Sequence, residues 1–282
     1  MSRMKALVLF ITVAVVLAGC SAFFQFNAFS GLSTPPAPQL ADYTGSGGLD
    51  RLQTDLASPA VVAALKNDPA TTTAIENYLL TQMGGMTTND EKQAAILYGD
   101  INLKTTDGEA LVNNVVTTLV NGISASSTIH DLLSAILPAD ALADPTVFSA
   151  MITALTNACP PYLQLGASIT DLNGNGKIDP GEGVPPGTNM GDVAQKAAVA
   201  WTVQVIYDDI NAALPAGPHT AAQVISQMYL LSNDPTTADP SVQSLQPAPY
   251  TDIPSNPTFH ANFVALGNLF ACAGIPMPAT TP

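Results

Sequence analysis

DPTVFSAMITALTNACPP, residues 144–161, is the stretch that shows the fold class most clearly. Its large apolar residues recur at the three- and four-residue spacing of one helix face: Phe148, Ile152 and Leu155. Asp144 before Pro145 places a capping side chain ahead of a proline at the first helical position, where the missing N–H is not needed. Pro160 and Pro161 are expected to close the helix, because an interior proline removes a hydrogen bond and clashes with the preceding turn. The stretch therefore predicts an amphipathic helix that ends near Cys159.

The same pattern extends over most of the chain. Apolar stripes at helical spacing are Ile75, Leu79 and Met83; Leu111, Val115 and Leu119; Val203, Tyr207, Ile210 and Leu214; and Phe259, Phe263, Leu266 and Phe270. Further capped helix starts are Ser58-Pro59, Asp68-Pro69 and Asn256-Pro257. No run alternates polar and apolar residues between hairpin turns, so a sheet is not expected. The sequence predicts an all-α, irregular multi-helix domain over residues 49–275, with a Pro-rich loop at 235–256 and a C-terminal tail at 276–282.

The composition excludes some classes of partner. The chain has 282 residues, of which 47% are apolar, which is enough to bury a substantial core. Charged residues make up only 11%, and 8 Lys and Arg against 22 Asp and Glu give a net charge of −14. No basic cluster occurs, and nucleic acid requires one. We therefore expect no nucleic-acid partner.

The N-terminus reads MSRMKALVLFITVAVVLAGC. Two basic residues precede an apolar run that is too short to span a membrane comfortably and suits a secretory signal. Leu17-Ala18-Gly19-Cys20 resembles the lipobox of bacterial lipoproteins. The resemblance implies removal of residues 1–19, acylation of Cys20 (palmitate being a typical acyl group), and a flexible tether over residues 20–48. Ser21 rather than Asp after that cysteine favours the outer over the inner membrane. A plain signal peptide or membrane anchor with an incidental cysteine is the alternative.

The sequence DLNGNGKIDPGE, residues 171–182, interrupts the helical pattern. It resembles a calcium loop of the EF-hand or dockerin type position by position, around the turn at Gly176. The resemblance implies one Ca²⁺ held by Asp171, Asn173, Asn175, the carbonyl of Lys177, Asp179 and Glu182. Ile178 fills the apolar eighth position. An Asn/Gly-rich turn without an ion is the alternative.

The flanks of this loop differ from those of a calcium sensor. Prolines 180, 185 and 186 forbid a regular helix directly after it. We therefore expect a structural ion that fixes the crossing between two helices, with the weak affinity of extracellular modules, about 10⁻⁴–10⁻³ M. DYTGSGGLDRLQ, residues 42–53, has the spacing of a degenerate second loop, with Leu49 facing Ile178. Its neutral twelfth residue, Gln53, favours instead a tether that leads into a helix.

After Cys20 two cysteines remain, Cys159 and Cys272. An oxidising compartment favours a disulfide between them, and the alternative is two buried free thiols.

No catalytic constellation is evident. The histidines at 130, 219 and 260 have no metal-ligand spacing, and no nucleophile elbow, P-loop or dinucleotide glycine pattern occurs. The sequence predicts a lipid-anchored cell-envelope protein with a structural calcium site that binds another envelope protein or a small ligand. A calcium-dependent envelope hydrolase with an unrecognised active site is the alternative.

Overall fold

The structure is a computed structural model that describes residues 37–121, 129–215, 217, 219–243, 245 and 257–275. All regular structure within these residues is helical, and no strand occurs among them. The predicted all-α class is therefore confirmed. The elements in chain order are η2 (Leu40–Asp42), α2 (Gly48–Leu56), α3 (Pro59–Lys66), α4 (Pro69–Gln82), α5 (Asn89–Lys104), α6 (Gly108–Asn121), α7 (Ile129–Ile136), α8 (Ala139–Ala143), α9 (Pro145–Ser168), α10 (Met190–Ala213), α11 (Ala221–Asn233), α12 (Pro240–Gln243) and α13 (Pro257–Cys272).

The predicted helix starts are those of the structure. Helices α3, α4, α9 and α13 each begin at the proline that the sequence marked. The carboxylates of Asp68 and Asp144 accept hydrogen bonds from the backbone N–H groups of Thr71 and Thr146, as N-caps do. These starts are encoded locally, which is why the sequence was sufficient to place them.

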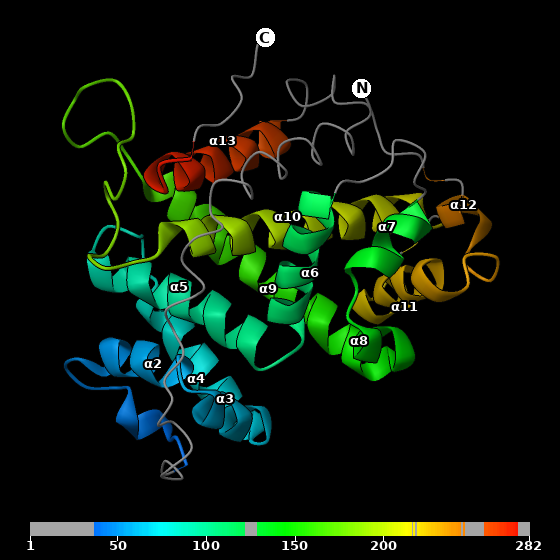
Figure 1. Ribbon diagram of the computed structural model, residues 1–282, viewed down its shortest axis with the longest axis horizontal. Coiled ribbons are helices and arrows are strands. Elements are labelled where there is room, and N and C mark those ends of the chain that lie inside the picture. The colour runs from blue at the N-terminus through cyan, green and yellow to red at the C-terminus, as the bar shows by residue number, and fades with distance from the viewer. Residues whose placement is uncertain are drawn as a thin grey trace.

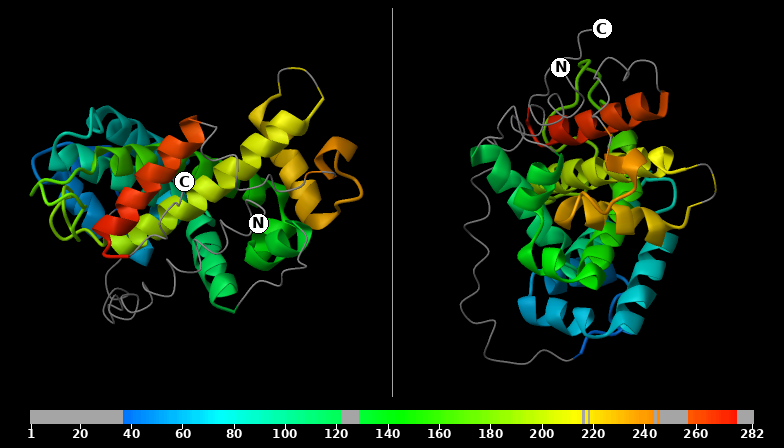
Figure 2. Two further views of the ribbon diagram at one scale, coloured as in Figure 1. Left: turned by 90° about the horizontal axis from the view of Figure 1, so that it is seen from above. Right: turned by 90° about the vertical axis from the view of Figure 1, so that its right-hand side faces the viewer.

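Helix α9 is the centre of the molecule (Figure 1). It packs against α5 on one side and against α10 and α13 on the other, and the view from above in Figure 2 shows α13 beside α10. The stripe predicted from Phe148, Ile152 and Leu155 is buried in the larger of two hydrophobic clusters. Trp201 of α10, the single tryptophan, lies in the same cluster.

A smaller hydrophobic cluster lies between α2, α3, α4 and α5, in the lower part of Figure 1. Helix α5 belongs to both clusters, since Leu97 and Ile101 face the smaller one and Ile96 and Leu103 face the larger one. The N-terminal helices are thereby joined to the central helix α9 through α5.

The expected end of α9 near Cys159 is wrong. The helix continues through Pro160 and Pro161 to Ser168. The two prolines deprive only the carbonyls of Thr156 and Asn157 of helical partners, and these two residues are at least partly exposed, so that water can replace the lost bonds. Burial of the next turns, which pack into the core on the far side of the prolines, favours continuation.

The folded domain also begins earlier than residue 49. Tyr43, which was expected in the tether, is fully buried, and its hydroxyl donates to Asp55 Oδ2 at 3.1 Å. Only residues 20–36 of the expected tether, with the signal segment and Cys20, lie outside the described residues. Most of the Pro-rich loop and the tail 276–282 lie outside them as well, and α12 forms inside that loop.

None of the helices in the described part of the chain has the length and apolar character needed to cross a membrane.

Candidate calcium loop

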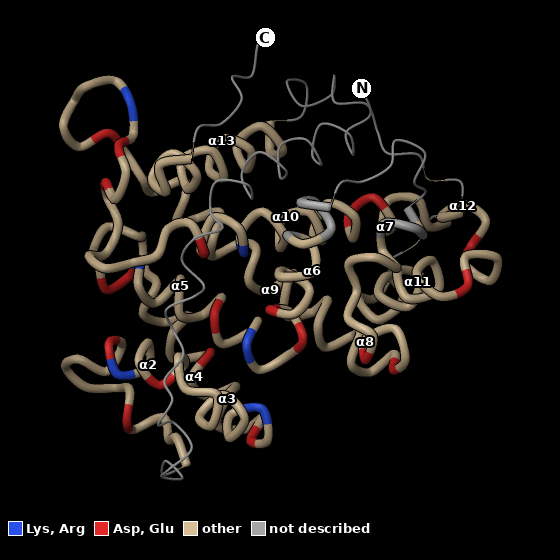
Figure 3. The backbone as a smooth tube through the Cα atoms, in the orientation of Figure 1, with Lys and Arg blue, Asp and Glu red and all other residues tan. Residues whose placement is uncertain are grey.

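The candidate calcium loop, residues 171–182, follows α9 directly and leads through a proline-containing segment to α10. Helix α9 ends at Ser168 and α10 begins at Met190, so no helix leaves the loop directly. In Figure 1 the loop projects from the body beside the C-terminal end of α13, and Figure 3 shows that it carries both acidic and basic residues. Ile178 is partly buried and packs against the larger core cluster. The remaining loop residues face solvent or are only partly covered.

Asp171, the first residue of the loop, organises its N-terminal half. Its Oδ1 atom accepts hydrogen bonds from the N–H groups of Gly174 at 2.7 Å and Asn175 at 3.3 Å, and its Oδ2 accepts from the N–H of Gly176 at 2.6 Å. Such bonds need a tightly turned backbone, which the positive φ angles of Gly174 (72°) and Gly176 (84°) provide. The carboxylate of Asp171 therefore points into the loop.

Glu182, the twelfth residue, closes the loop from the other end. Its Oε1 accepts from the N–H groups of Leu172 at 2.8 Å and Asn173 at 3.0 Å, and its Oε2 accepts from the N–H of Asp179 at 2.9 Å. One carboxylate thus holds the first and last turns together. Asp171 and Glu182 stand at the two ends of the loop, and the carboxylates of both accept hydrogen bonds from backbone N–H groups between them.

Asp179 is the third carboxylate of the loop, and it binds the side chains of three loop residues. Its Oδ2 accepts from Nδ2 of Asn173 at 2.8 Å and from Nδ2 of Asn175 at 2.7 Å, and its Oδ1 pairs with Nζ of Lys177 at 3.1 Å. The hydrogen bond from Asn173 and the contacts with Lys177 and Asn175 hold the pKa of Asp179 below its ordinary value. The carboxylate is therefore ionised at neutral pH, as a cation ligand must be.

The donor set of the loop fits a hard cation. The side chains of Asp171, Asn173, Asn175, Asp179 and Glu182 all offer oxygen, and the loop contains no thiol or imidazole that would favour zinc or copper. The Oδ1 atoms of Asn173 and Asn175 each accept one bond, from the N–H groups of Asn175 and Lys177. An amide oxygen has two lone pairs, so each retains one for an ion.

Carboxylates alone are insufficient here. Within the part of the chain that the structure describes, no three His, Cys, Asp or Glu side chains lie close enough together to hold a metal ion. Calcium would therefore need the amide oxygens and the Lys177 carbonyl in addition to the three acids. It would also replace the two asparagine N–H donors and the Lys177 ammonium as the neutralising partner of Asp179.

The degenerate second loop at residues 42–53 does not form. Residues 48–56 form helix α2. The side-chain oxygens of Asp50 and Gln53 both accept hydrogen bonds from Nε2 of Gln93 on α5, at 2.9 and 3.0 Å. Leu49 packs on the smaller hydrophobic cluster and Ile178 on the larger one. The helix of the favoured interpretation is present as α2, but the residues before it are no free tether, because Tyr43 is fully buried.

The disulfide predicted between Cys159 and Cys272 is not present in the structure, where both are buried free thiols. Cys159 lies inside α9 near Asp208. Burial of the thiol is the main cause that raises its pKa to about 12, and the negative charge of Asp208 adds to the effect. Cys272 ends α13, and its Sγ donates to the carbonyl oxygen of Glu182 at 3.4 Å. The two thiols thus have different surroundings, and the alternative of two free thiols is the one found.

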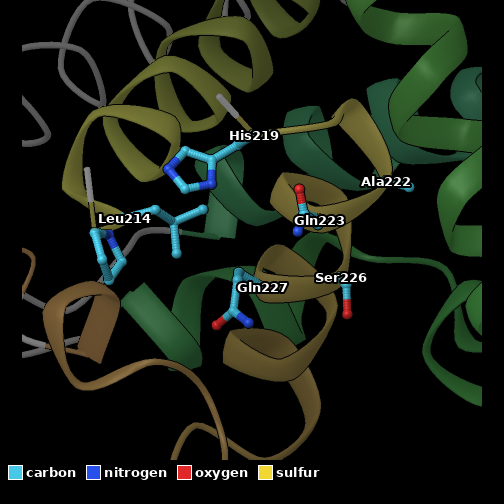
Figure 4. A pocket seen from close by; sticks show the side chains of 7 residues that line it. Leu214, His219, Ala222, Gln223, Ser226 and Gln227 are labelled. Carbon is cyan, nitrogen blue, oxygen red and sulfur yellow. The ribbon is translucent and has the colours of Figure 1, made fainter. Parts of the chain in front are cut away.

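Two grooves among the described residues each hold one ionisable side chain. One lies between the end of α10 and α11 (Figure 4) and contains His219 with Gln223, Ser226 and Gln227. The other contains Glu76 among hydroxyl and amide side chains of α5 and α9, and burial raises the pKa of Glu76. Neither of these two grooves pairs an acid with a base among its lining residues.

Sequence reasoning missed a buried charge cluster at the centre of the molecule. Nζ of Lys196 on α10 lies 2.8 Å from Oδ1 of Asp100 on α5 and 2.6 Å from Oδ2 of Asp192. Tyr162 of α9 donates to the same Asp100 oxygen at 3.4 Å. The four-residue spacing of Asp192 and Lys196 is a signal from which this helical ion pair could have been predicted. No local signal indicated Asp100, which is 96 residues away from Lys196.

Comparison of the chain with protein-family models, with curated proteins and with solved structures gives no match.

Proposed function

We propose that this chain is a lipid-anchored cell-envelope protein whose loop 171–182 holds one structural Ca²⁺ and whose helical body binds another envelope protein or a small ligand. The observation that carries the proposal is the geometry of the loop. Asp171 and Glu182 are each fixed by three backbone N–H groups, and the carboxylate of Asp179 accepts from the amide groups of Asn173 and Asn175 in the same loop. The ionised carboxylates repel one another, and a cation inside the turn would relieve that repulsion.

Calcium suits this loop better than magnesium does. The six implied ligands include amide and carbonyl oxygens, and Ca²⁺ accepts such mixed sets of six to eight oxygens in flexible geometry. Mg²⁺ requires a nearly ideal octahedron and dehydrates reluctantly. Because Ile169 before the loop is buried and the loop runs from α9 toward α10, a bound ion would stabilise the crossing of these two helices.

Calcium should raise the melting temperature of the wild type by a few degrees. An ion that binds only the folded loop adds about 1.4 kcal/mol of stability when its concentration is ten times the dissociation constant. Glu182→Gln should lose most of that response, because it removes a ligand charge and the acceptor for one of three backbone N–H groups. Differential scanning calorimetry with calcium, magnesium or chelator measures the effect.

Glu91→Gln is the matched control for this experiment. Glu91 is a carboxylate of the same kind, since it accepts from the N–H groups of Thr87 and Thr88 at the start of α5, but it lies outside the loop. This variant should lower stability by itself and keep the full calcium response. An equal calcium shift in Glu182→Gln and in the wild type would remove the assignment of the loop as a metal site.

The lipid anchor is proposed from the signal segment and Cys20. Removal of residues 1–19 leaves six Lys and Arg against 22 Asp and Glu, a net charge of −16. Such a chain is repelled by anionic headgroups, so that acyl chains must hold it at the membrane. Ser21 after the acylated cysteine supports the outer membrane as the location.

Replacing Cys20 with alanine should move the protein from the membrane fraction to the soluble fraction after cell lysis. Cys159→Ala is the matched control, because it removes a buried thiol of α9 and leaves the lipobox intact. It should fractionate with membranes like the wild type. Persistence of Cys20→Ala in washed membranes would contradict the anchor.

A further inference from the structure

The C-terminal end of the calcium loop is attached to two helices that are distant in sequence. The N–H of Gly181 donates to the carbonyl oxygen of Cys272 at 2.8 Å, and Sγ of Cys272 donates to the carbonyl oxygen of Glu182 at 3.4 Å. Nζ of Lys92 on α5 donates to the carbonyl oxygen of Gly183. Residues 181 and 182 are thus hydrogen-bonded to the C-terminal end of α13, and residue 183 is hydrogen-bonded to a side chain of α5.

Packing reinforces this attachment. The turn that ends α13 contains Gly274, whose φ of 74° suits glycine, and a Cβ at that position would lie 3.4 Å from Cγ of Pro180. The ring of Pro180 therefore lies beside the turn. Cys272 is 2% exposed and Lys92 is 8% exposed, so the two partners that the loop covers are shielded from solvent, whereas Pro180, Gly181 and Gly274 are exposed.

The same residue closes the loop and contacts α13. The side chain of Glu182 holds the N–H groups of Leu172, Asn173 and Asp179, while its backbone carbonyl accepts from Cys272. An ion bound by the Glu182 carboxylate is therefore held by the same residue whose backbone carbonyl meets α13. Any loosening of the turn at Glu182 changes the contact with Cys272 directly.

Helix α13 is well fixed elsewhere. Trp201 of α10 packs against Phe259 and Phe263 with ring centroids 4.8 and 6.4 Å apart, and Asn268 donates to the Gly166 carbonyl of α9 at 3.0 Å. The N-terminal three quarters of the helix thus have their own contacts. The last turn also packs in the larger hydrophobic cluster through Leu269 and Phe270, and the contacts with the loop are made by Cys272 and Gly274.

We propose that the loop is a calcium-dependent clasp for the end of α13. Calcium holds residues 180–183 against Cys272 and Gly274, and loss of the ion opens this contact while the rest of α13 remains packed. The proposal rests on the calcium site proposed above and adds a regulation to it: the calcium concentration sets how often the C-terminal end of the domain is open.

The two buried thiols provide the test. The mature chain, residues 20–282, is treated with N-ethylmaleimide at one pH and ionic strength, with calcium at ten times the dissociation constant or with EGTA. Labelling of each cysteine is followed by peptide mass spectrometry. If opening releases the ion, calcium slows the labelling of Cys272 by the factor 1 + [Ca²⁺]/Kd, which is about tenfold.

Cys159 is the internal control, because it is 1% exposed inside α9, away from the loop, and requires global unfolding. In EGTA, Cys272 should label at least tenfold faster than Cys159, and calcium should bring the two rates closer together. Glu182→Gln should show fast labelling of Cys272 with or without calcium, whereas Glu91→Gln should keep the calcium effect. The emission of Trp201 should stay unchanged throughout, because its contacts with α13 lie at the other end of the helix.

Two results would overturn the clasp, and they differ in what they say about the calcium site. If calcium raises the melting temperature but the rate for Cys272 does not change, or equals the rate for Cys159 in EGTA, the ion site stands and the clasp is wrong. If calcium changes neither quantity, both are wrong. A shift of Trp201 emission in EGTA would show that the whole helix leaves, which also contradicts a local clasp.

Discussion

Replacing Lys196 with methionine is expected to lower the free energy of unfolding by up to about 3–5 kcal/mol, because it leaves the largely covered carboxylate of Asp100 without its cation, whereas Asp192, 44% exposed, is partly solvated. Lys196 is 2% exposed and bonds to Asp100 and Asp192 at 2.8 and 2.6 Å. The side chain of Asp100 is only 17% exposed, so that water cannot replace the lost ammonium fully. The cluster joins α5, α9 and α10, and its loss affects the packing of all three helices.

The charge state of Lys196 gives this prediction a pH dependence. Burial by itself would lower the pKa of Lys196, but the carboxylates of Asp100 and Asp192 outweigh it and raise the pKa above its ordinary value of 10.5. The folded protein therefore binds this proton more tightly than the unfolded chain does. The resulting stability is fully present below pH 10.5 and is lost as the pH rises through the folded-state pKa. The methionine variant should lack this part of the alkaline loss.

Lys66→Met is the matched control for Lys196→Met. Lys66 also pairs with an aspartate, Asp107, at 3.4 Å, but its side chain is 54% exposed. Such a surface pair contributes at most about 1 kcal/mol. Urea unfolding of both variants gives the comparison. If both variants lost the same free energy of unfolding, the burial of Lys196 would add nothing to the stabilisation by its ion pairs.

Gly166→Ala is expected to destabilise the protein by about 1–3 kcal/mol, although alanine favours helices over glycine by about 1 kcal/mol. A Cβ on Gly166 would lie 2.2 Å from the carbonyl oxygen of Ala265 on α13 and 2.8 Å from its carbon. Those atoms are backbone, so relief requires α13 to move away from α9. The bond from Asn268 to the Gly166 carbonyl, 3.0 Å long, would be strained by the same movement.

Ala167→Gly measures the propensity difference at the neighbouring position of the same helix. Ala167 is exposed, and the substitution should cost at most about 1 kcal/mol. Thermal unfolding of both variants separates the two effects, because Gly166→Ala should destabilise against the propensity trend. A gain of stability in Gly166→Ala would contradict the close approach of α9 and α13.

The features that the sequence predicted are those that short segments encode. The stripe of Phe148, Ile152 and Leu155 and the capped starts at Asp68 and Asp144 depend on neighbours within one or two turns, and the structure has them as expected. The loop at 171–182 was located for the same reason, since its hydrogen bonds join residues at most ten positions apart. Its ion remains a prediction.

The features that the sequence did not predict depend on distant packing. Helix α9 continues through Pro160 and Pro161 because the turns on both sides of them are buried. This burial outweighs the tendency of proline to end a helix. The bonds from Lys92 and Cys272 to the end of the loop join residues 91 and 90 positions apart. No local pattern encodes such contacts, and the pairing of Lys196 with Asp100 was missed for the same reason.

Titration of the ¹⁵N-labelled mature chain with calcium, followed by amide chemical shifts, tests the calcium loop most directly. If the loop holds calcium, saturable shifts centred on residues 171–183 are expected, with a dissociation constant of about 10⁻⁴–10⁻³ M, smaller shifts with magnesium, and a weak response in Glu182→Gln. The Gly181 amide, which bonds to Cys272, should be among those that shift. Amide shifts that fail to saturate, or that spread over the acidic surface and leave residues 171–183 unchanged, would contradict it.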